Sequence, residues 1–398
     1  MGSGNLEQRL ILYKPGSDGH NFEVVGVREP HPNLGVYECF VVDRKRKRSR
    51  HLRKVKKVHL FGPLSDPYIV ECKSIDDAVK AQGAFKDLLI ARSSKSLPCE
   101  IKRVAILVGR PDRISAATAQ EGLHIAGSRL LEESGEDLEA YTPDATRRVG
   151  FQKLFENEVE ANQLLRMNIT GEDAELLPRL LDQGYDPVPY MVQVYVGGNT
   201  LTDVLIRRKL SAGQCRTIGE RLSRALMLMH GLGIVHQDCK PTNIRLKERE
   251  FSSRTSPDRY SPILLDLSNT QKVSKGRRVP SYKRGSFWVW APEQVSQEPF
   301  TSHSTDIWAF GITMCLAYSR THPVSKSPIR LIRSSELKSR QNARLKKSTL
   351  KAIKGWKGKV LDYIPAKERE MISGCLHPDW KKRPSAYEIN SFYRSILG

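Results

Sequence analysis

The residues most able to do chemistry lie in the stretch 234–244, Ile-Val-His-Gln-Asp-Cys-Lys-Pro-Thr-Asn-Ile, where polar side chains stand between two apolar flanks. Asp238 can accept the proton of a hydroxyl nucleophile, and Lys240 can neutralise a γ-phosphate. Asn243, together with Asp266 further along the chain, can hold a divalent cation. Packing gives no reason for four polar residues at these positions, so the pattern predicts a catalytic loop.

This loop resembles the catalytic loop of the eukaryotic-type Ser/Thr protein kinases. Four further motifs of that family follow in the expected order. Ile-Leu-Leu-Asp266 resembles the strand and metal-binding Asp of the D-F-G motif, and Trp-Ala-Pro-Glu293 resembles the A-P-E motif. Asp306-Ile-Trp-Ala-Phe-Gly is similar to the buried central helix. Arg383-Pro-Ser is similar to the late Arg motif, whose Arg usually pairs with the A-P-E Glu.

The resemblance implies a two-lobed α+β protein-kinase-like fold that uses ATP and Mg²⁺ to phosphorylate Ser or Thr of a protein. In that interpretation Asp238 is the base, Lys240 contacts the γ-phosphate, and Asn243 and Asp266 are the metal ligands. The substrate partner is a protein that presents a Ser or Thr hydroxyl.

The same resemblance predicts the elements and nucleotide-binding residues of a small lobe. Its predicted strands are residues 121–127, 128–133, 137–141, 177–181 and 190–196, and its predicted helix is residues 155–167. Glu158, on the helix 155–167, takes the place of the ion-pairing αC Glu. The end of the last strand is the expected hinge that hydrogen-bonds adenine, at Gln193, Val194 and Tyr195.

The Lys that family members carry on their third strand, roughly fifteen to twenty residues before the αC Glu, is not found. No Lys lies between Lys102 and Lys153, and Glu139 or Ala140 stands at the expected place. Two alternatives follow. Either the chain is a pseudokinase that keeps the fold, or another cation reaches the phosphates, the candidates being Arg129, Arg147, Arg148 and Lys153.

The first hundred residues have a different pattern. Strands are predicted over residues 22–27, 36–42, 67–73 and 102–108, because these runs are rich in β-branched and aromatic residues or alternate with period two. A helix is predicted over residues 76–91 from the spacing of its apolar residues. An acid at the end of one strand, a Glu-x-Lys on the next and a Gln on the following helix resemble the PD-(D/E)XK nuclease core, specifically the nuclease-related domain called NERD.

That second resemblance implies an α/β nuclease-like domain with a site of its own. Asp43 and Glu71 would ligate Mg²⁺, Lys73 would orient or activate water, and Gln82 would support the phosphate. A surface Glu-x-Lys pair on any strand gives the same pattern, so a domain that binds nucleic acid without cleaving it is the alternative.

The charge of the chain indicates which kinds of binding partner to expect. The formal net charge of +21 and the pI near 9.7 favour polyanionic partners. Arg44 and Lys57 bound a run of ten Lys or Arg in fourteen residues, which predicts contact with DNA or RNA, with a solvated loop as the alternative. A second basic region covers residues 320–359, with a solvated helix face as the alternative. The basic residues within 275–285 would favour acidic or phosphorylated targets if they dock a substrate, and a solvated basic loop is the equal alternative.

Two absences in the sequence bear on location. No apolar run approaches the roughly 20 residues of a bilayer span, so a membrane-spanning protein is excluded and no membrane partner is expected. The seven scattered cysteines include no C-x-x-C pair and are typical of a reducing compartment. The expected location is the cytoplasm.

The sequence therefore predicts two domains. Residues 1–112 are the NERD-like domain, and residues 120–396 the kinase-like domain, with a small lobe over about 120–196 and a large lobe over about 197–396. The predicted function is Mg-ATP-dependent phosphorylation of protein Ser or Thr, in a pairing similar to bacterial phage-defence kinases. The alternative is a pseudokinase sensor coupled to a nucleic-acid-binding or nuclease module.

Overall fold

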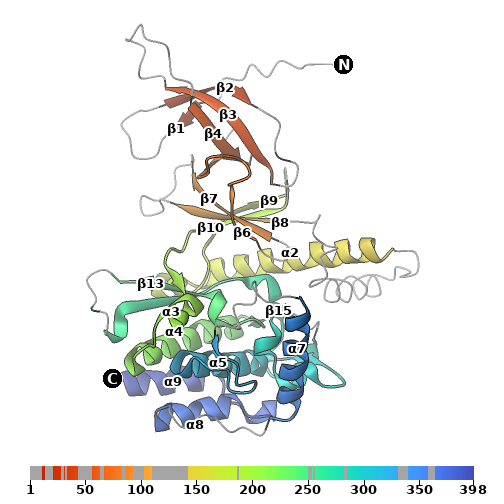
Figure 1. Ribbon diagram of the computed structural model, residues 1–398, viewed down its shortest axis with the longest axis vertical. Helices are drawn as coiled ribbons and strands as arrows, with labels where there is room; N and C mark the ends of the chain where they lie inside the picture. Colours follow the sequence, from red (N-terminus) through yellow and green to blue (C-terminus); the bar gives the residue numbers. More distant parts are fainter. Residues whose placement is uncertain are drawn as a thin grey trace. The chain divides into compact units, whose positions relative to one another are not determined.

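The computed structural model describes most of the chain (Figure 1). The described residues are 11–13, 21–27, 31, 34–43, 56–62, 67–82, 86–93, 103–109, 142–185, 188–249, 253, 256–281, 285–329, 339–356 and 364–398. The chain divides into two compact units. The strand unit comprises residues 1–123, 142–151 and 180–195, and the helical unit comprises residues 124–141, 152–179 and 196–398.

The strand unit is built around one antiparallel sheet in the order β1-β2-β3-β4-β5-β7-β8-β10-β9, with β6 paired to β7. Its strands are β1 (Ile11–Tyr13), β2 (Asn21–Val27), β3 (Val36–Asp43), β4 (Lys56–Phe61), β5 (Tyr68–Val70), β6 (Val79–Gln82), β7 (Lys86–Ser93), β8 (Val104–Gly109), β9 (Leu180–Gly184) and β10 (Tyr190–Val194). The alternation of Val104, Ile106 and Val108 on the buried face of β8 shows how period two forms the sheet's core.

The predicted strands at 22–27, 36–42 and 102–108 are confirmed as β2, β3 and β8, whereas only residues 68–70 of the predicted strand 67–73 form β5. The predicted helix over residues 76–91 is wrong, because β6 and β7 occupy that segment. The short apolar run of β7 fits both the helical and the strand period of apolar residues, so the spacing alone does not distinguish a helix from a strand. Pairing with β5 on one side and β8 on the other stabilises the extended form.

The neighbour of β8 lies far along the chain. β8 pairs antiparallel with β10, and Ile106 stands opposite Val192 while Ala105 stands opposite Gln193. Strands from both sides of the predicted division at residues 112–120 therefore share one sheet. The division itself stays a prediction, and the three strands predicted within residues 121–141 lie outside the described residues.

All the helices of the described residues follow β8 along the chain. Their bounds are α2 (Pro143–Asn168), α3 (Leu201–Arg207), α4 (Ala212–Gly231), α5 (His303–Ser319), α7 (Ser339–Lys354), α8 (Ala366–Cys375) and α9 (Ala386–Leu397). Capping boxes at Thr200, Ser211 and Ser385 begin α3, α4 and α9, since each hydroxyl accepts from the backbone N–H three residues on. The predicted helix 155–167 is confirmed within α2, which begins twelve residues earlier.

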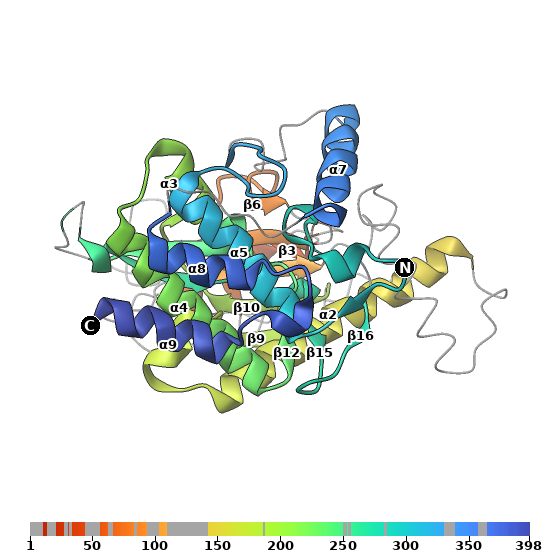
Figure 2. The same ribbon diagram turned by 90° about the horizontal axis from the view of Figure 1, so that it is seen from below.

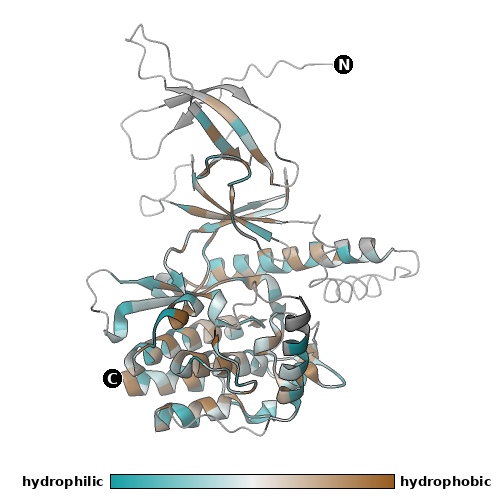
Figure 3. Ribbon diagram, in the orientation of Figure 1, coloured by the Kyte–Doolittle hydropathy of each residue, from teal (hydrophilic) through white to brown (hydrophobic). Residues whose placement is uncertain are grey.

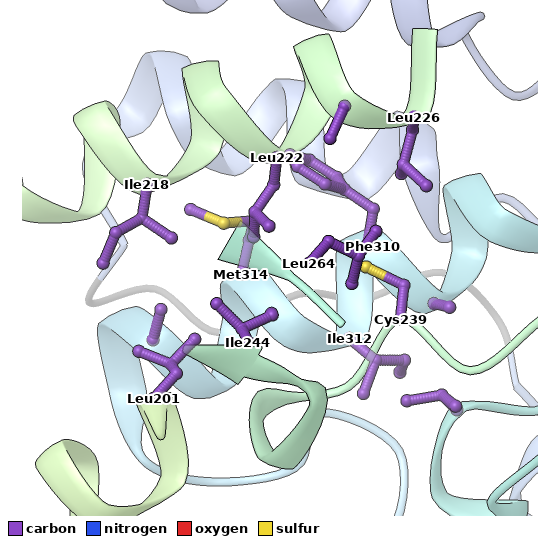
Figure 4. Close-up of a cluster of buried hydrophobic side chains, with 14 of the residues drawn as sticks. Leu201, Ile218, Leu222, Leu226, Cys239, Ile244, Leu264, Phe310, Ile312 and Met314 are labelled. Carbon is purple, nitrogen blue, oxygen red and sulfur yellow. The ribbon is translucent and has the colours of Figure 1, made fainter. Parts of the chain in front are cut away.

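The core of the helical unit forms around α5, which is buried over Thr305 to Ala317 and therefore has no polar face. α4 and α8 pack against it, and α9 packs along α4 (Figures 1 and 2). Figure 4 shows Leu222 of α4 and Phe310 of α5 among the buried side chains that meet there. The predicted buried central helix is confirmed.

Short strands and turns complete the helical unit and carry most of its polar loops. The strands are β11 (Asn199–Thr200), β12 (Ile234–Val235), β13 (Ile244–Glu248), β14 (Tyr260–Leu264), β15 (Gln271–Lys272), β16 (Val279–Pro280) and β17 (Phe300–Thr301). The 3₁₀ turns are η4 (Gly171–Leu176), η5 (Pro241–Asn243), η6 (Pro257–Arg259), η7 (Leu267–Asn269), η8 (Phe287–Val289), η9 (Pro292–Val295) and η11 (Trp380–Lys382). Within the part of the chain that the structure describes, no helix is both long and apolar enough to cross a bilayer.

Candidate active site

Asp306, at the start of α5, holds the backbone of the loop that follows β12. Its carboxylate accepts hydrogen bonds from the backbone N–H groups of His236 and Gln237, both at 2.7 Å, and lies 2.9 Å from Nε2 of His230. Burial alone would raise the pKa of Asp306, but the hydrogen bond and charge of His230 and the amide of His236 hold that pKa below its usual value. The loop is therefore tied to a buried negative charge.

The same anchor supports an uncommon backbone conformation. Gln237 has φ 64°, a value that costs a non-glycine residue about 1–3 kcal/mol unless its surroundings enforce it. Its amide bonds Asp306, its side-chain Nε2 donates to the carbonyl of Asn269 at 2.6 Å, and its Oε1 accepts from Thr301 at 2.9 Å. These contacts turn the next residue, Asp238, toward its own partners.

Four donors converge on the carboxylate of Asp238, a residue only 2% exposed, and one of them, Nδ2 of Asn269, lies 3.5 Å from Oδ2. Lys240 Nζ lies 2.6 Å from Oδ2, and Asn243 Nδ2 lies 3.1 Å from the same oxygen. The backbone N–H of Ser286 donates to Oδ1 at 2.8 Å. The predicted grouping of Asp238, Lys240 and Asn243 is therefore present, with the acid oriented on both oxygens.

Ser286, like Asn269, contacts Asp238 although no role was predicted for it from the sequence. Besides its N–H contact, its hydroxyl lies 2.6 Å from Nζ of Lys240, so it contacts both members of the predicted pair. Gly285 allows this approach, because its φ is +76° and a Cβ there would lie 2.7 Å from the carbonyl oxygen of Gln237. A Gly-Ser pair shortly before the A-P-E-like motif is the signal that could have found it.

Strand pairing places the two predicted metal ligands on neighbouring segments. Ile244 of β13 stands opposite Leu264 of β14, and the N–H of Leu265 donates to the carbonyl of Asn243 at 2.8 Å. Asp266 comes next, with φ 68° and with Oδ1 accepting from Ser268 at 2.7 Å. Because Nδ2 of Asn243 is directed at Asp238, its side-chain oxygen is the atom left for a cation. A carboxylate and an amide oxygen are ligands that suit Mg²⁺.

The predicted nucleotide-binding residues fall in different units. Glu158 is buried on α2 in the helical unit, where its carbonyl accepts from Nδ2 of Asn162 at 2.8 Å. Gln193 and Val194 end β10 in the strand unit, and the N–H of Tyr195 donates to the carbonyl of Arg103 at 3.2 Å. Their binding roles stay predictions.

The sheet shows which strand lies beside the predicted hinge strand. β8 borders β10 and reads Val-Ala-Ile-Leu-Val-Gly, so it contains no Lys. Ala105 and Leu107 alternate with its buried residues and share the more exposed face. The phosphate-binding Lys was expected shortly before Glu158, in a segment that follows β8 along the chain. β8 itself carries no cation that could take its place.

The residues of the predicted nuclease site are only partly described. Glu71 and Lys73 line a hollow of about 710 Å³ beside β6, but Glu71 pairs with Arg92 at 2.8 Å and with Arg103 at 3.1 Å. Asp43 ends β3 and Gln82 ends β6, and their side chains lie outside the described residues. Gln82 was expected on a helix and lies on a strand instead. Glu71 thus joins β7 to the residue before β8, a structural role that leaves its carboxylate engaged.

A buried ion pair connects the A-P-E-like motif to the end of the chain. The guanidinium of Arg383 contacts Glu293 through two bonds of 2.7 Å, and their side chains are 0% and 3% exposed. Arg383 also lies over the ring of Trp308, 5.1 Å from its centroid. The ion pair implied by the kinase resemblance is confirmed.

Comparison with known proteins agrees with this geometry. The protein kinase domain family matches residues 182–392, more than half of the chain. The chain belongs to the protein kinase domain family. The match covers the anchoring Asp306, the loop with Asp238 and the Glu293–Arg383 pair, whereas the NERD-like resemblance of the first hundred residues falls outside it.

Individual relatives of this kinase domain are Ser/Thr kinases. Serine/threonine-protein kinase D of Synechocystis sp. is 30% identical over 183 residues, which cover 44% of this chain and 32% of the relative. PknD of Chlamydia pneumoniae is 28% identical over 45% of this chain and 22% of its own length. Ppk25 of Schizosaccharomyces pombe is 27% identical over 51% and 42%. The matched part of the chain thus spans less than half the length of these relatives.

The segment after Ser286 is held by a buried neutral histidine. His322 lies with Nε2 2.6 Å from the carbonyl of Trp288, and its Nδ1 accepts from the N–H groups of Val324 and Ser325 at 3.3 and 3.1 Å. Burial lowers the pKa of His322 to about 4. The imidazole therefore stays neutral in the folded kinase domain, donating from Nε2 and accepting at Nδ1.

We expect this histidine to make folding sensitive to acid. A folded-state pKa below the unfolded value of about 6.5 means that the unfolded chain binds the proton more readily. The stabilisation is complete above pH 6.5 and is lost as the pH falls toward 4, by up to about 1.4 kcal/mol per pH unit. Urea unfolding of the wild type and of His322→Asn between pH 7.5 and 4.5 measures it. The variant should show the shallower pH dependence, and equal slopes would contradict the assignment.

Proposed function

We propose that this kinase domain transfers the γ-phosphate of Mg-ATP to Ser or Thr hydroxyls of a protein. The observation that carries the proposal is the Asp238 carboxylate, oriented by Lys240 on one oxygen and by the Ser286 amide on the other. A carboxylate fixed in this way is suited to orient a hydroxyl nucleophile and to accept its proton. The Ser/Thr kinase relatives support the same reaction.

Each neighbouring residue has a role in that reaction. Lys240, 2.6 Å from Asp238, balances the negative charge of the transferring phosphoryl group beside the attacking hydroxyl. The oxygens of Asn243 and Asp266 would hold Mg²⁺, and the bound ion would neutralise phosphate charge. Gln193, Val194 and Tyr195 would bind adenine, and Glu158 would take the place of the αC Glu.

The direct test is transfer of labelled γ-phosphate from Mg-ATP to Ser, Thr and Tyr versions of one peptide. The proposal expects label on Ser or Thr, with transfer abolished by EDTA and restored by excess Mg²⁺. Label on the Tyr peptide alone, or transfer that resists chelation, would contradict it.

Ser286 provides a more specific prediction. Ser286→Ala removes the hydroxyl 2.6 Å from Lys240 and leaves the backbone contact with Asp238. Loss of one hydrogen bond to a charged group is worth about 1.5 kcal/mol, so kcat should fall by about tenfold or somewhat more. Ser286→Thr keeps the hydroxyl and is the matched control. Steady-state kinetics on a Ser peptide measure both, and equal losses in the two variants would show that packing, rather than the hydroxyl, matters.

The sequence of β8 favours a second function, that of a nucleotide sensor. The described strand beside β10 has Leu107 and no Lys, so a fixed cation for the α- and β-phosphates is missing from it. Weak positioning of the leaving group would then reduce transfer, and the domain would act as a nucleotide sensor. Nucleotide binding by the wild type, without any transfer above the Asp238→Asn background, would favour this alternative.

Functions of the first hundred residues are also proposals. The run bounded by Arg44 and Lys57 supports contact with DNA or RNA through phosphates, and binding should then weaken with salt. The link to phage defence rests on the resemblance of the domain pairing. A nuclease role for Glu71 has less support, since two arginines engage its carboxylate. A cytoplasmic location remains the expectation from the cysteines.

A further inference from the structure

One face of α7 carries a stripe of positive charge. The helix contains six Lys or Arg and no Asp or Glu, so its cations have no acidic partner within the helix. Arg344, Lys347, Lys351 and Lys354 are all exposed, and their spacings of three, four and three residues place them on one face. Ten residues of helix span about 15 Å, so the stripe is as long as a short extended peptide of four or five residues.

The opposite face of α7 fixes the direction of this stripe. Thr349 and Ile353 are buried, and Ile353 belongs to the core of the helical unit. Because an amphipathic helix buries its apolar face, the cations are held toward solvent. Figure 3 shows hydrophilic colouring over much of the described part of α7. The packing of α7 on the core thus keeps the stripe exposed to solvent.

α7 also lies beside the segment that reaches the catalytic residues. It packs against η8 and η9, and Nζ of Lys346 lies 5.5 Å from the centroid of the Trp290 ring. η8 begins directly after Ser286, whose N–H and hydroxyl contact Asp238 and Lys240. A chain that brings a hydroxyl to Asp238 therefore passes close to the segment on which α7 rests.

We propose that α7 is a docking helix for an acidic segment of the protein substrate. The proposal rests on the function proposed above and adds the substrate class. An extended chain places every second side chain about 6.8 Å apart, close to the rise of one helical turn, so successive carboxylates can meet successive cations of the stripe. Its position beside η8 favours a protein substrate over a nucleic acid, because only a substrate must lie at this segment and at Asp238 together.

The experiment compares two peptides of equal length with one central Ser, one carrying Glu and the other Gln at alternate positions. The α7 variant is Lys347→Glu with Lys351→Glu, and the control is Lys367→Glu with Arg394→Glu, on exposed positions of α8 and α9. Reversing two surface contacts should raise KM for the Glu peptide about tenfold in the α7 variant alone. The KM for the Gln peptide should not change. The preference of the wild type for the Glu peptide over the Gln peptide should shrink as the salt concentration rises.

A binding measurement separates docking from catalysis. Fluorescence anisotropy follows a labelled Glu peptide that has Ala in place of Ser. If the wild type binds it and the α7 variant does not, docking is supported even where no phosphate is transferred, in which case only the proposed function fails. The neutral pair Lys347→Gln with Lys351→Gln replaces the charge reversal if that variant unfolds.

Three results would overturn the docking role. The first is equal affinity of the wild type for the Glu and Gln peptides. The second is equal weakening by the α7 variant and the control on α8 and α9. The third is a twelve-nucleotide single strand that binds more tightly than the Glu peptide and is lost in the α7 variant, which would assign the stripe to nucleic acid.

Discussion

Asp238→Asn should lower kcat for phosphate transfer by about a thousandfold, within the range of general-base catalysis. The amide has nearly the same shape but cannot accept the proton of the attacking hydroxyl. It also replaces a charged acceptor with a neutral one for Lys240 and for the Ser286 amide. Single-turnover labelling of a Ser peptide measures the loss directly.

The control for this substitution must show that the site is still assembled. Nucleotide binding and thermal unfolding of Asp238→Asn should stay close to wild type, because the loop backbone is held by Asp306 and not by Asp238. Transfer that persists within a few-fold of wild type would show that Asp238 is not the base. The kinase proposal would then depend on another acid.

Arg383→Met should destabilise the helical unit by about 3–5 kcal/mol, because it leaves the buried carboxylate of Glu293 without its charged partner. The Met keeps most of the volume, so packing against Trp308 changes less than charge does. Urea unfolding followed by tryptophan fluorescence measures the shift in midpoint.

Two controls separate burial from charge. Adding Glu293→Gln to Arg383→Met removes the stranded charge and should recover a large part of the loss. Lys272→Ala breaks the exposed pair Lys272–Glu160, whose side chains are 60% and 51% exposed, and should cost about 0.5 kcal/mol. Equal losses for Arg383→Met and Lys272→Ala would contradict the importance of burial.

Much of the helical unit was predictable from motifs whose residues lie close together in the sequence. Asp238, Lys240 and Asn243 lie within six residues, so one loop carries all three, and Asp306 holds the backbone of that loop. α5 was predictable for a similar reason, since a long run of apolar residues has few stable alternatives to a buried helix. Even the Glu293–Arg383 pair, ninety residues apart, was implied by motifs that occur as a set.

The tertiary structure alone decided contacts that join distant segments or that depend on strand pairing. Residues 86–93 became β7 because β5 and β8 supply its backbone partners, a choice that a short apolar run does not specify. Pairing of β8 with β10 identified the strand beside the predicted hinge. Ser286 reached Asp238 across 48 residues because Gly285 has no side chain to prevent the approach. Spacing in a sequence records neighbours along the chain, whereas these contacts arise from backbone hydrogen bonds between strands and from close packing in the folded protein.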